Sequence, residues 1–119
     1  MSDILQFLSR SLPKTFRDRP ESRPAWVSRY SDSEWPRVEH FLLLFCDAFL
    51  VRRTGLQRLY PDDKLMEIYN EIFRFWPVDE LQFPHLQKAL RREYGVEILT
   101  EDFECQTLGS LYDRVRHAA

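Results

Sequence analysis

The residues best placed for acid–base chemistry are two carboxylates and a histidine in the second half of the chain. Asp79 and Glu80 precede His85 by little more than one helical turn, so a helix beginning here would gather them into a cluster able to exchange protons with a substrate. Carboxylates also collect at helix starts because they balance the positive end of the helix dipole. We therefore interpret the cluster as structural and predict that the chain is not an enzyme.

The remaining reactive side chains match no known catalytic or metal-binding pattern. The acidic pairs at 62–63 and 101–102 suit helix starts, and no opposing carboxylate accompanies either pair. Cys46 and Cys105 lie far apart without metal-ligand spacing, and Cys46 sits in an apolar run typical of a buried thiol. We find no HExxH, paired CxxC, glycine-rich phosphate loop or GxSxG motif. The sequence thus predicts no metal and no cofactor. The histidines are scattered: His40, His85 and His117.

Length and composition predict one helical domain. A chain of 119 residues with 44% hydrophobic and 14% aromatic residues can bury a single core. Its three glycines are too few for a β-fold with many tight turns. The net charge of −2 provides no global basic field for nucleic acid, although basic residues are concentrated near the N-terminus.

Several features favour a cytoplasmic protein without a membrane partner. The two distant cysteines fit a reducing compartment. The first twelve residues lack a charged segment followed by an unbroken apolar core, so we do not expect a signal peptide. The longest apolar run, at 41–45, is far too short to span a bilayer.

Residues 1–32 predict an N-terminal helix followed by an extended arm packed on the domain. Apolar residues recur with helical spacing between Asp3 and Leu12, and this helix would dock on its own domain or on a partner. Residues 13–32 are rich in proline and arginine and show no sustained period. The arm's aromatics, interleaved with arginine, could bind single-stranded nucleic acid, but we expect them to anchor the arm to the core. They are Phe16, Trp26 and Tyr30.

Residues 33–119 predict a helical bundle, beginning with a central helix that is apolar nearly all round. This helix would be capped by Asp32 or Ser33 and stopped at Gly55. After a loop over 56–63, a helix capped by Asp62 or Asp63 would run to Pro77.

The last third of the chain carries the clearest helix starts and stops. A helix would begin near Phe83 and end at Gly95, with Leu86, Leu90 and Tyr94 facing inward. An extended link at 96–99 and a short turn around Phe103 would follow. The final helix would be capped by Thr107 and would bury four side chains, Leu108, Leu111, Tyr112 and Val115.

Four stretches in this region resemble the second half of an acyl carrier protein. They are LYPDDKL at 59–65, DEL at 79–81, HLQKALRREYGVEI at 85–98 and TLGSLYDRV at 107–115. Together they extend over about half of the chain. The resemblance implies an acyl-carrier-protein-like four-helix bundle, to which the N-terminal helix and arm would be added.

The resemblance also bears on function, because the family attaches phosphopantetheine to a serine that follows an aspartate. Asp79 and Leu81 match the family residues on either side, but the serine position is Glu80, whose carboxylate cannot form the phosphodiester. We therefore expect a bacterial protein-interaction module, such as an adaptor, inhibitor or immunity-type protein, that binds another protein as a monomer or homodimer. A genuine carrier is the alternative. The partner-binding candidates are Asp79, Glu80, Leu81, Lys88, Arg91 and Arg92.

Overall fold

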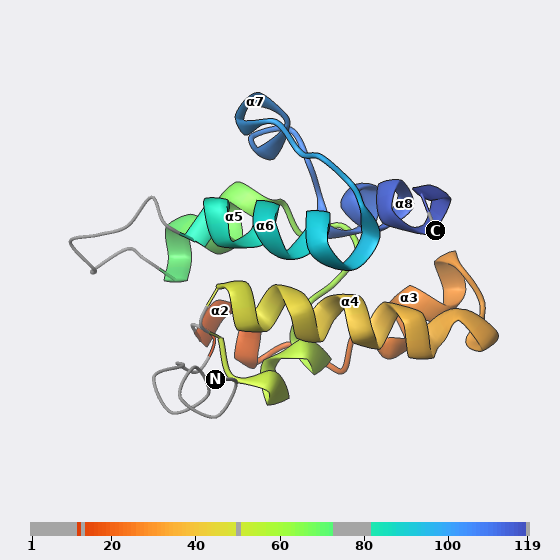
Figure 1. Ribbon diagram of the computed structural model, residues 1–119. Coiled ribbons are helices and arrows are strands. Elements are labelled where there is room, and N and C mark those ends of the chain that lie inside the picture. The colour runs from red at the N-terminus through yellow and green to blue at the C-terminus, as the bar shows by residue number, and fades with distance from the viewer. Residues whose placement is uncertain (1–11, 13, 50, 73–81, 119) are drawn as a thin grey trace.

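The computed structural model describes residues 12, 14–49, 51–72 and 82–118, and this part of the chain is all-α (Figure 1). One isolated antiparallel bridge joins Lys64 and Thr107. The all-α prediction is confirmed. The elements are α2 (Lys14–Arg17), α3 (Arg23–Arg29), the 3₁₀ helix η1 (Asp32–Glu34), α4 (Trp35–Ala48), the 3₁₀ helix η2 (Arg53–Arg58), α5 (Leu65–Ile72), α6 (Gln82–Tyr94), α7 (Thr100–Phe103) and α8 (Leu108–Ala118).

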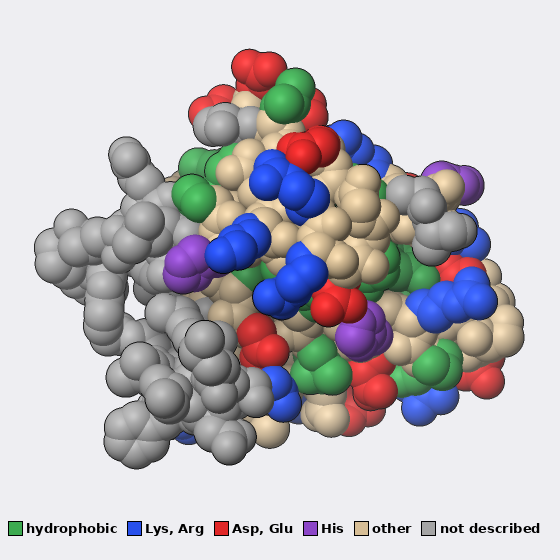
Figure 2. Space-filling model, viewed as in Figure 1, with side chains coloured by type: hydrophobic (Ala, Val, Ile, Leu, Met, Phe, Trp, Pro, Cys, Tyr) green, Lys and Arg blue, Asp and Glu red, His purple; other side chains and the backbone are tan. Residues whose placement is uncertain are grey.

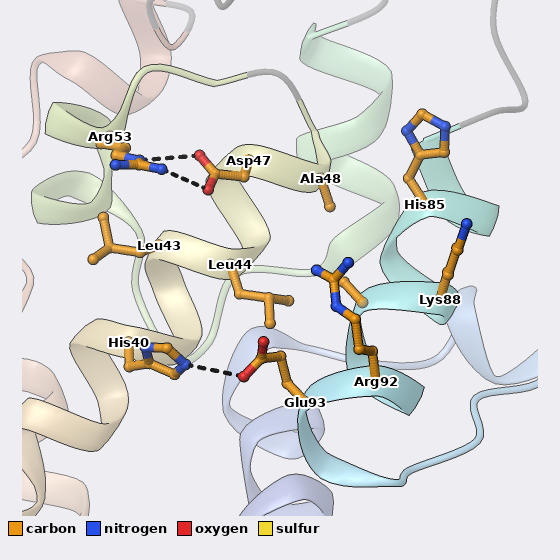
Figure 3. A pocket seen from close by; sticks show the side chains of 11 residues that line it. His40, Leu43, Leu44, Asp47, Ala48, Arg53, His85, Lys88, Arg92 and Glu93 are labelled. Carbon is orange, nitrogen blue, oxygen red and sulfur yellow. Dashed lines mark hydrogen bonds and ion pairs between the residues drawn. The ribbon is translucent and has the colours of Figure 1, made fainter. Parts of the chain in front are cut away.

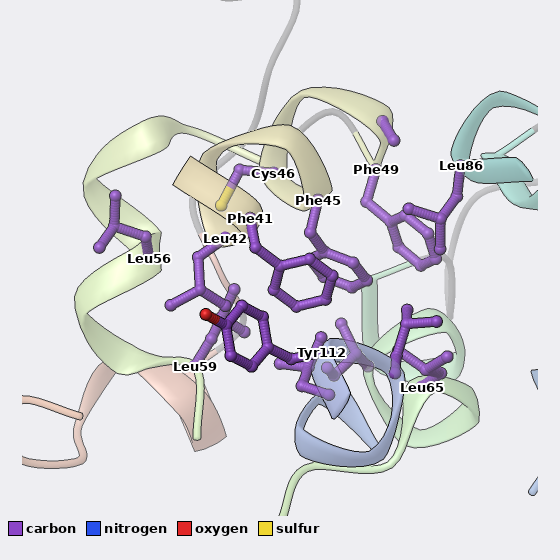
Figure 4. Packing of buried hydrophobic residues seen from close by; sticks show 14 of the residues in the cluster. Phe41, Leu42, Phe45, Cys46, Phe49, Leu56, Leu59, Leu65, Leu86 and Tyr112 are labelled. Carbon is purple, nitrogen blue, oxygen red and sulfur yellow. The ribbon is translucent and has the colours of Figure 1, made fainter. Parts of the chain in front are cut away.

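The core is built around α4, as its apolar sequence predicts. Phe41 and Phe45 are fully buried (Figure 4). The ring of Phe41 lies 5.4 Å from that of Tyr112 in α8, and Phe49 stacks on Phe45 with ring centroids 4.4 Å apart. Burying such rings supplies most of the driving force for folding. Helices α5, α6 and α8 cover this side of α4 with fully buried leucines, including Leu65, Leu86, Leu90 and Leu111.

The elements from α6 onward follow the sequence prediction closely. Helix α6 has Pro84 in its first turn, where the missing N–H breaks no helical bond. It ends before Gly95, which has a φ of 67° that other residues rarely adopt. Thr107 caps α8, since its hydroxyl oxygen accepts from the amide of Ser110 at 3.0 Å.

The arm is not extended as predicted, because residues 14–29 contain α2 and α3. Pro24 lies in the first turn of α3, where proline favours a helix rather than breaking it. The aromatic anchors do pack on the core: Trp26 is fully buried and its indole N–H donates to the carbonyl of Leu59 at 2.7 Å. The predicted helix before Leu12 lies almost entirely outside the described residues.

The central helix ends earlier than predicted. Helix α4 stops at Ala48, and Gly55 lies inside η2 instead of terminating α4. The chain turns because Val51 and Leu56 are buried against the core, which a continued straight helix would not allow. Arg53 then folds back onto Asp47, with Nη2 3.0 Å from Oδ2.

The predicted caps of the central helix were also wrong. Neither Asp32 nor Ser33 caps α4, which follows η1 directly with Glu34 at its N-cap and no side-chain cap. The carboxylate of Asp63 accepts from Arg19 and from the amide of Tyr60. Asp63 thus holds the arm against the turn before α5.

Among the described helices, none is both long enough and apolar enough to cross a bilayer.

Candidate interaction groove

A surface groove runs between α4 and α6, on the face where Lys and Arg side chains gather over α6 (Figure 2). It consists of two hollows of about 550 and 460 Å³ that share His40 in their walls. The first lies between α4 and α6 (Figure 3), and the second lies between α4 and the C-terminal ends of α6 and α8. The groove therefore follows α4 from Pro36 to Ala48.

The wall of the first hollow is apolar because α4 carries more leucines than the core can cover. Leu43 and Leu44 pack against the edge of the core but stay partly exposed in the groove. Ala89 faces them from α6 and is also partly exposed. A small side chain at Ala89 keeps this space open.

The rim of the first hollow is predominantly basic. Lys88 and Arg92 are exposed, and no carboxylate of the described part of the chain forms an ion pair with either. Arg92 extends from α6 toward α4, whereas Lys88 and His85 point along α6 (Figure 3). The rim therefore presents positive charge beside an apolar wall.

The rim also contains two acidic residues. Asp47 pairs with Arg53, and Glu93 lies 3.6 Å from the imidazole Nε2 of His40 across the groove. With Lys88, Arg92 and Arg53 against Asp47 and Glu93, the rim carries three positive and two negative charges when His40 is neutral.

The second hollow is more aromatic. Tyr94 and Tyr112 line it with Arg37 and Arg116. Arg116 is bound to Glu34, at 2.8 Å from Nε to Oε2, and the hydroxyl of Tyr112 donates to the same carboxylate. Burial, with a smaller contribution from the charge of Glu93, raises the pKa of Tyr94, so this phenol stays neutral at physiological pH.

The structure separates the basic residues predicted to bind a partner. Lys88 and Arg92 line the groove, whereas Arg91 faces Glu97, with its Nε 2.6 Å from the carboxylate. Asp79, Glu80 and Leu81 lie outside the described residues, so His85 is seen in the rim without its proposed acidic neighbours.

The groove wall itself was missed from the sequence. The sequence predicts that α4 is central because it is apolar nearly all round, but it does not place Leu43, Leu44 and His40 in a groove beside α6. The available signal was the width of the apolar stripe: a helix apolar nearly all round presents more surface than two neighbouring helices cover.

The described residues contain no cluster of three or more His, Cys, Asp or Glu side chains able to hold a metal ion. The hydroxyl of Ser110 donates to Gln106 and Thr107 beside the start of α8. No protein-family model matches the chain, and no similar curated protein or solved structure was found.

Proposed function

We propose that this chain is a non-enzymatic, acyl-carrier-like protein-interaction module that binds another protein through the α4–α6 groove. The observation that carries the proposal is the apolar wall of Leu43, Leu44 and Ala89 beside the exposed Lys88 and Arg92. Adaptor, inhibitor and immunity-type roles all fit such a module. The carrier-like sequence pattern supports the kind of fold, and Glu80 argues against a bound phosphopantetheine.

The chemistry of the groove suits a protein surface better than a small substrate. Apolar side chains left open between charged neighbours mark interaction sites, because covering them removes apolar area from water. Of the acidic side chains in the rim, Asp47 is paired with Arg53 and Glu93 faces His40 across the groove. Binding explains these features without a reaction.

The test is affinity capture from cell extract by three tagged proteins: wild type, Lys88→Glu/Arg92→Glu, and a control with the same charge change on α2, Lys14→Glu/Arg17→Glu. We expect the wild type and the control to recover the same specific partner and the groove variant to lose it, because reversed charges repel the partner's surface. Circular dichroism confirms that each variant folds. Equal recovery by all three proteins, or no specific partner under gentle conditions, would contradict the proposal.

A further inference from the structure

We infer that the occupant of the groove is an amphipathic α-helix of the partner protein whose polar face is acidic. This inference rests on the proposed function and adds the chemistry and shape of the partner. It is carried by the length of the groove, by its apolar wall and by the sign of its unpaired charges.

The length of the groove matches a short helix. The lining residues of α4 extend from Pro36 through His40 to Ala48. At a rise of about 1.5 Å per residue, this distance is about 18 Å, or roughly three helical turns. A helix laid into such a groove presents apolar residues at intervals of three and four, which is a common mode of peptide recognition.

The apolar wall gives that helix a surface to cover. Leu43, Leu44 and Ala89 line the first hollow, and the aromatic ring of Tyr94 lines the second. Phosphate groups gain nothing from the wall of leucine and alanine in the first hollow, and this wall offers nucleic-acid bases no flat aromatic face on which to stack. The first hollow therefore favours a polypeptide over an oligonucleotide.

The charges of the rim select an acidic partner. Lys88, Arg92 and, in the second hollow, Arg37 form no ion pair with a carboxylate of the described residues. Asp47 is paired with Arg53, and Glu93 lies beside His40, whose imidazole balances its charge only when protonated, so positive charges outnumber negative ones along the rim. An occupant carrying Glu or Asp would gain the attraction that the rim's own acids do not supply, whereas a basic helix would be repelled.

The test uses three synthetic fluorescent peptides of the same length, each too short to bind by bulk charge alone. The first has leucines at intervals of three and four with glutamates on the polar face, the second has lysines in place of the glutamates, and the third keeps the glutamates but replaces leucine by serine. Fluorescence anisotropy is measured against the wild type, Lys88→Glu/Arg92→Glu and the Lys14→Glu/Arg17→Glu control.

We expect the leucine–glutamate peptide to bind the wild type and the α2 control equally, and at least about tenfold more tightly than either other peptide. The Lys88→Glu/Arg92→Glu variant should bind the leucine–glutamate peptide about tenfold more weakly than the wild type does. It should bind the lysine peptide more tightly than the wild type does. Such an exchange of preference is not produced by misfolding, because a misfolded protein would lose both peptides.

Equal binding of the glutamate and lysine peptides, or tighter binding of a single-stranded oligonucleotide at the same site, would overturn the inference. If no peptide binds while affinity capture still depends on Lys88 and Arg92, the interaction function stands and the acidic helix is wrong. If affinity capture also does not depend on Lys88 and Arg92, both the proposed interaction function and the acidic helix are wrong.

Discussion

At the scale of single residues, Gly109 shows how closely the last helix meets the turn before α5. Its amide donates to the carbonyl of Pro61 at 2.8 Å, and its own carbonyl accepts from the hydroxyl of Tyr30 at 3.0 Å. A Cβ at this position would lie 2.9 Å from the Pro61 oxygen. Glycine is required here by close approach of the backbone.

This packing predicts that Gly109→Ala destabilises the protein, although alanine normally favours a helix by about 1 kcal/mol over glycine. The clash with the Pro61 carbonyl oxygen cannot be relieved by rotating a side chain, and overpacking of this kind costs about 1–3 kcal/mol. Urea denaturation followed by tryptophan fluorescence measures the change. A more stable Gly109→Ala protein would show that the turn at Pro61 moves freely away from α8.

At the scale of elements, the arm formed by α2 and α3 is held by a buried electrostatic contact. The guanidinium of Arg19 lies against the rings of Phe16 and Tyr60, and its two terminal nitrogens donate to the carboxylate of Asp63 at 2.8 and 2.7 Å. Within the described residues, its Nε is buried without a partner. This lost hydrogen bond partly offsets the stabilisation that the bidentate contact provides.

We therefore expect Asp63→Asn to loosen the arm. The substitution removes the charge that the half-buried guanidinium of Arg19 contacts, at a cost of about 1 kcal/mol after screening by solvent. Hydrogen exchange should show faster opening of α3, with the core of α4 less affected. Asp62→Asn is the matched control, because Asp62 is 93% exposed and touches Arg29 only at 3.4 Å. Equal effects of the two substitutions would mean that Arg19 does not hold the arm.

The elements also show which parts of the fold the sequence specifies locally. Helix α6 and the start of α8 were predicted because Gly95 and Thr107 determine a helix end and a helix start within a few residues of themselves. Asp63 is also a residue type typical of a helix start, but its carboxylate binds Arg19, which lies 44 residues away in the sequence. A prediction based on neighbouring residues cannot anticipate such a distant partner.

The groove was only partly predictable for a related reason. Lys88 and Arg92 were named from their place on the outer face of a predicted helix, and they do line the groove. Arg91 has the same residue type and a similar position, yet it pairs with Glu97. The opposite wall of the groove comes from α4, and the contact of α4 with α6 is a tertiary feature that no local pattern contains.

At the scale of the whole molecule, buried proton-bearing groups limit stability in alkaline solution. Burial, more than any charge nearby, raises the pKa of the Cys46 thiol and of the Tyr30 and Tyr112 hydroxyls above their ordinary values of 9.0 and 10.0. The unfolded chain therefore releases these protons at lower pH than the folded protein does. The contribution of these groups to the free energy of unfolding is complete below about pH 9 and is lost as the pH rises.

We accordingly expect the free energy of unfolding to fall above pH 9, by up to about 1.4 kcal/mol per pH unit from Cys46 alone. Urea denaturation between pH 7 and about pH 11 measures the slope. In the plot of unfolding free energy against pH, Cys46→Ala should flatten the part that begins near pH 9. Tyr112→Phe should flatten the part that begins near pH 10. The exposed thiol provides the control, because Cys105→Ala should leave the slope unchanged. A pH-independent stability across this range would contradict the burial of Cys46.

The cluster formed by Trp26, Tyr30 and Tyr112 joins α3 to α8, two helices from opposite ends of the sequence. During synthesis, α3 leaves the ribosome long before its aromatic partner on α8 has been made. The contact between Tyr30 and Gly109 spans 79 residues, so this side of the core can close only when nearly all of the described chain is available. Until then the aromatic side chains of the arm are not covered by α8, and exposed apolar surface of this kind favours aggregation.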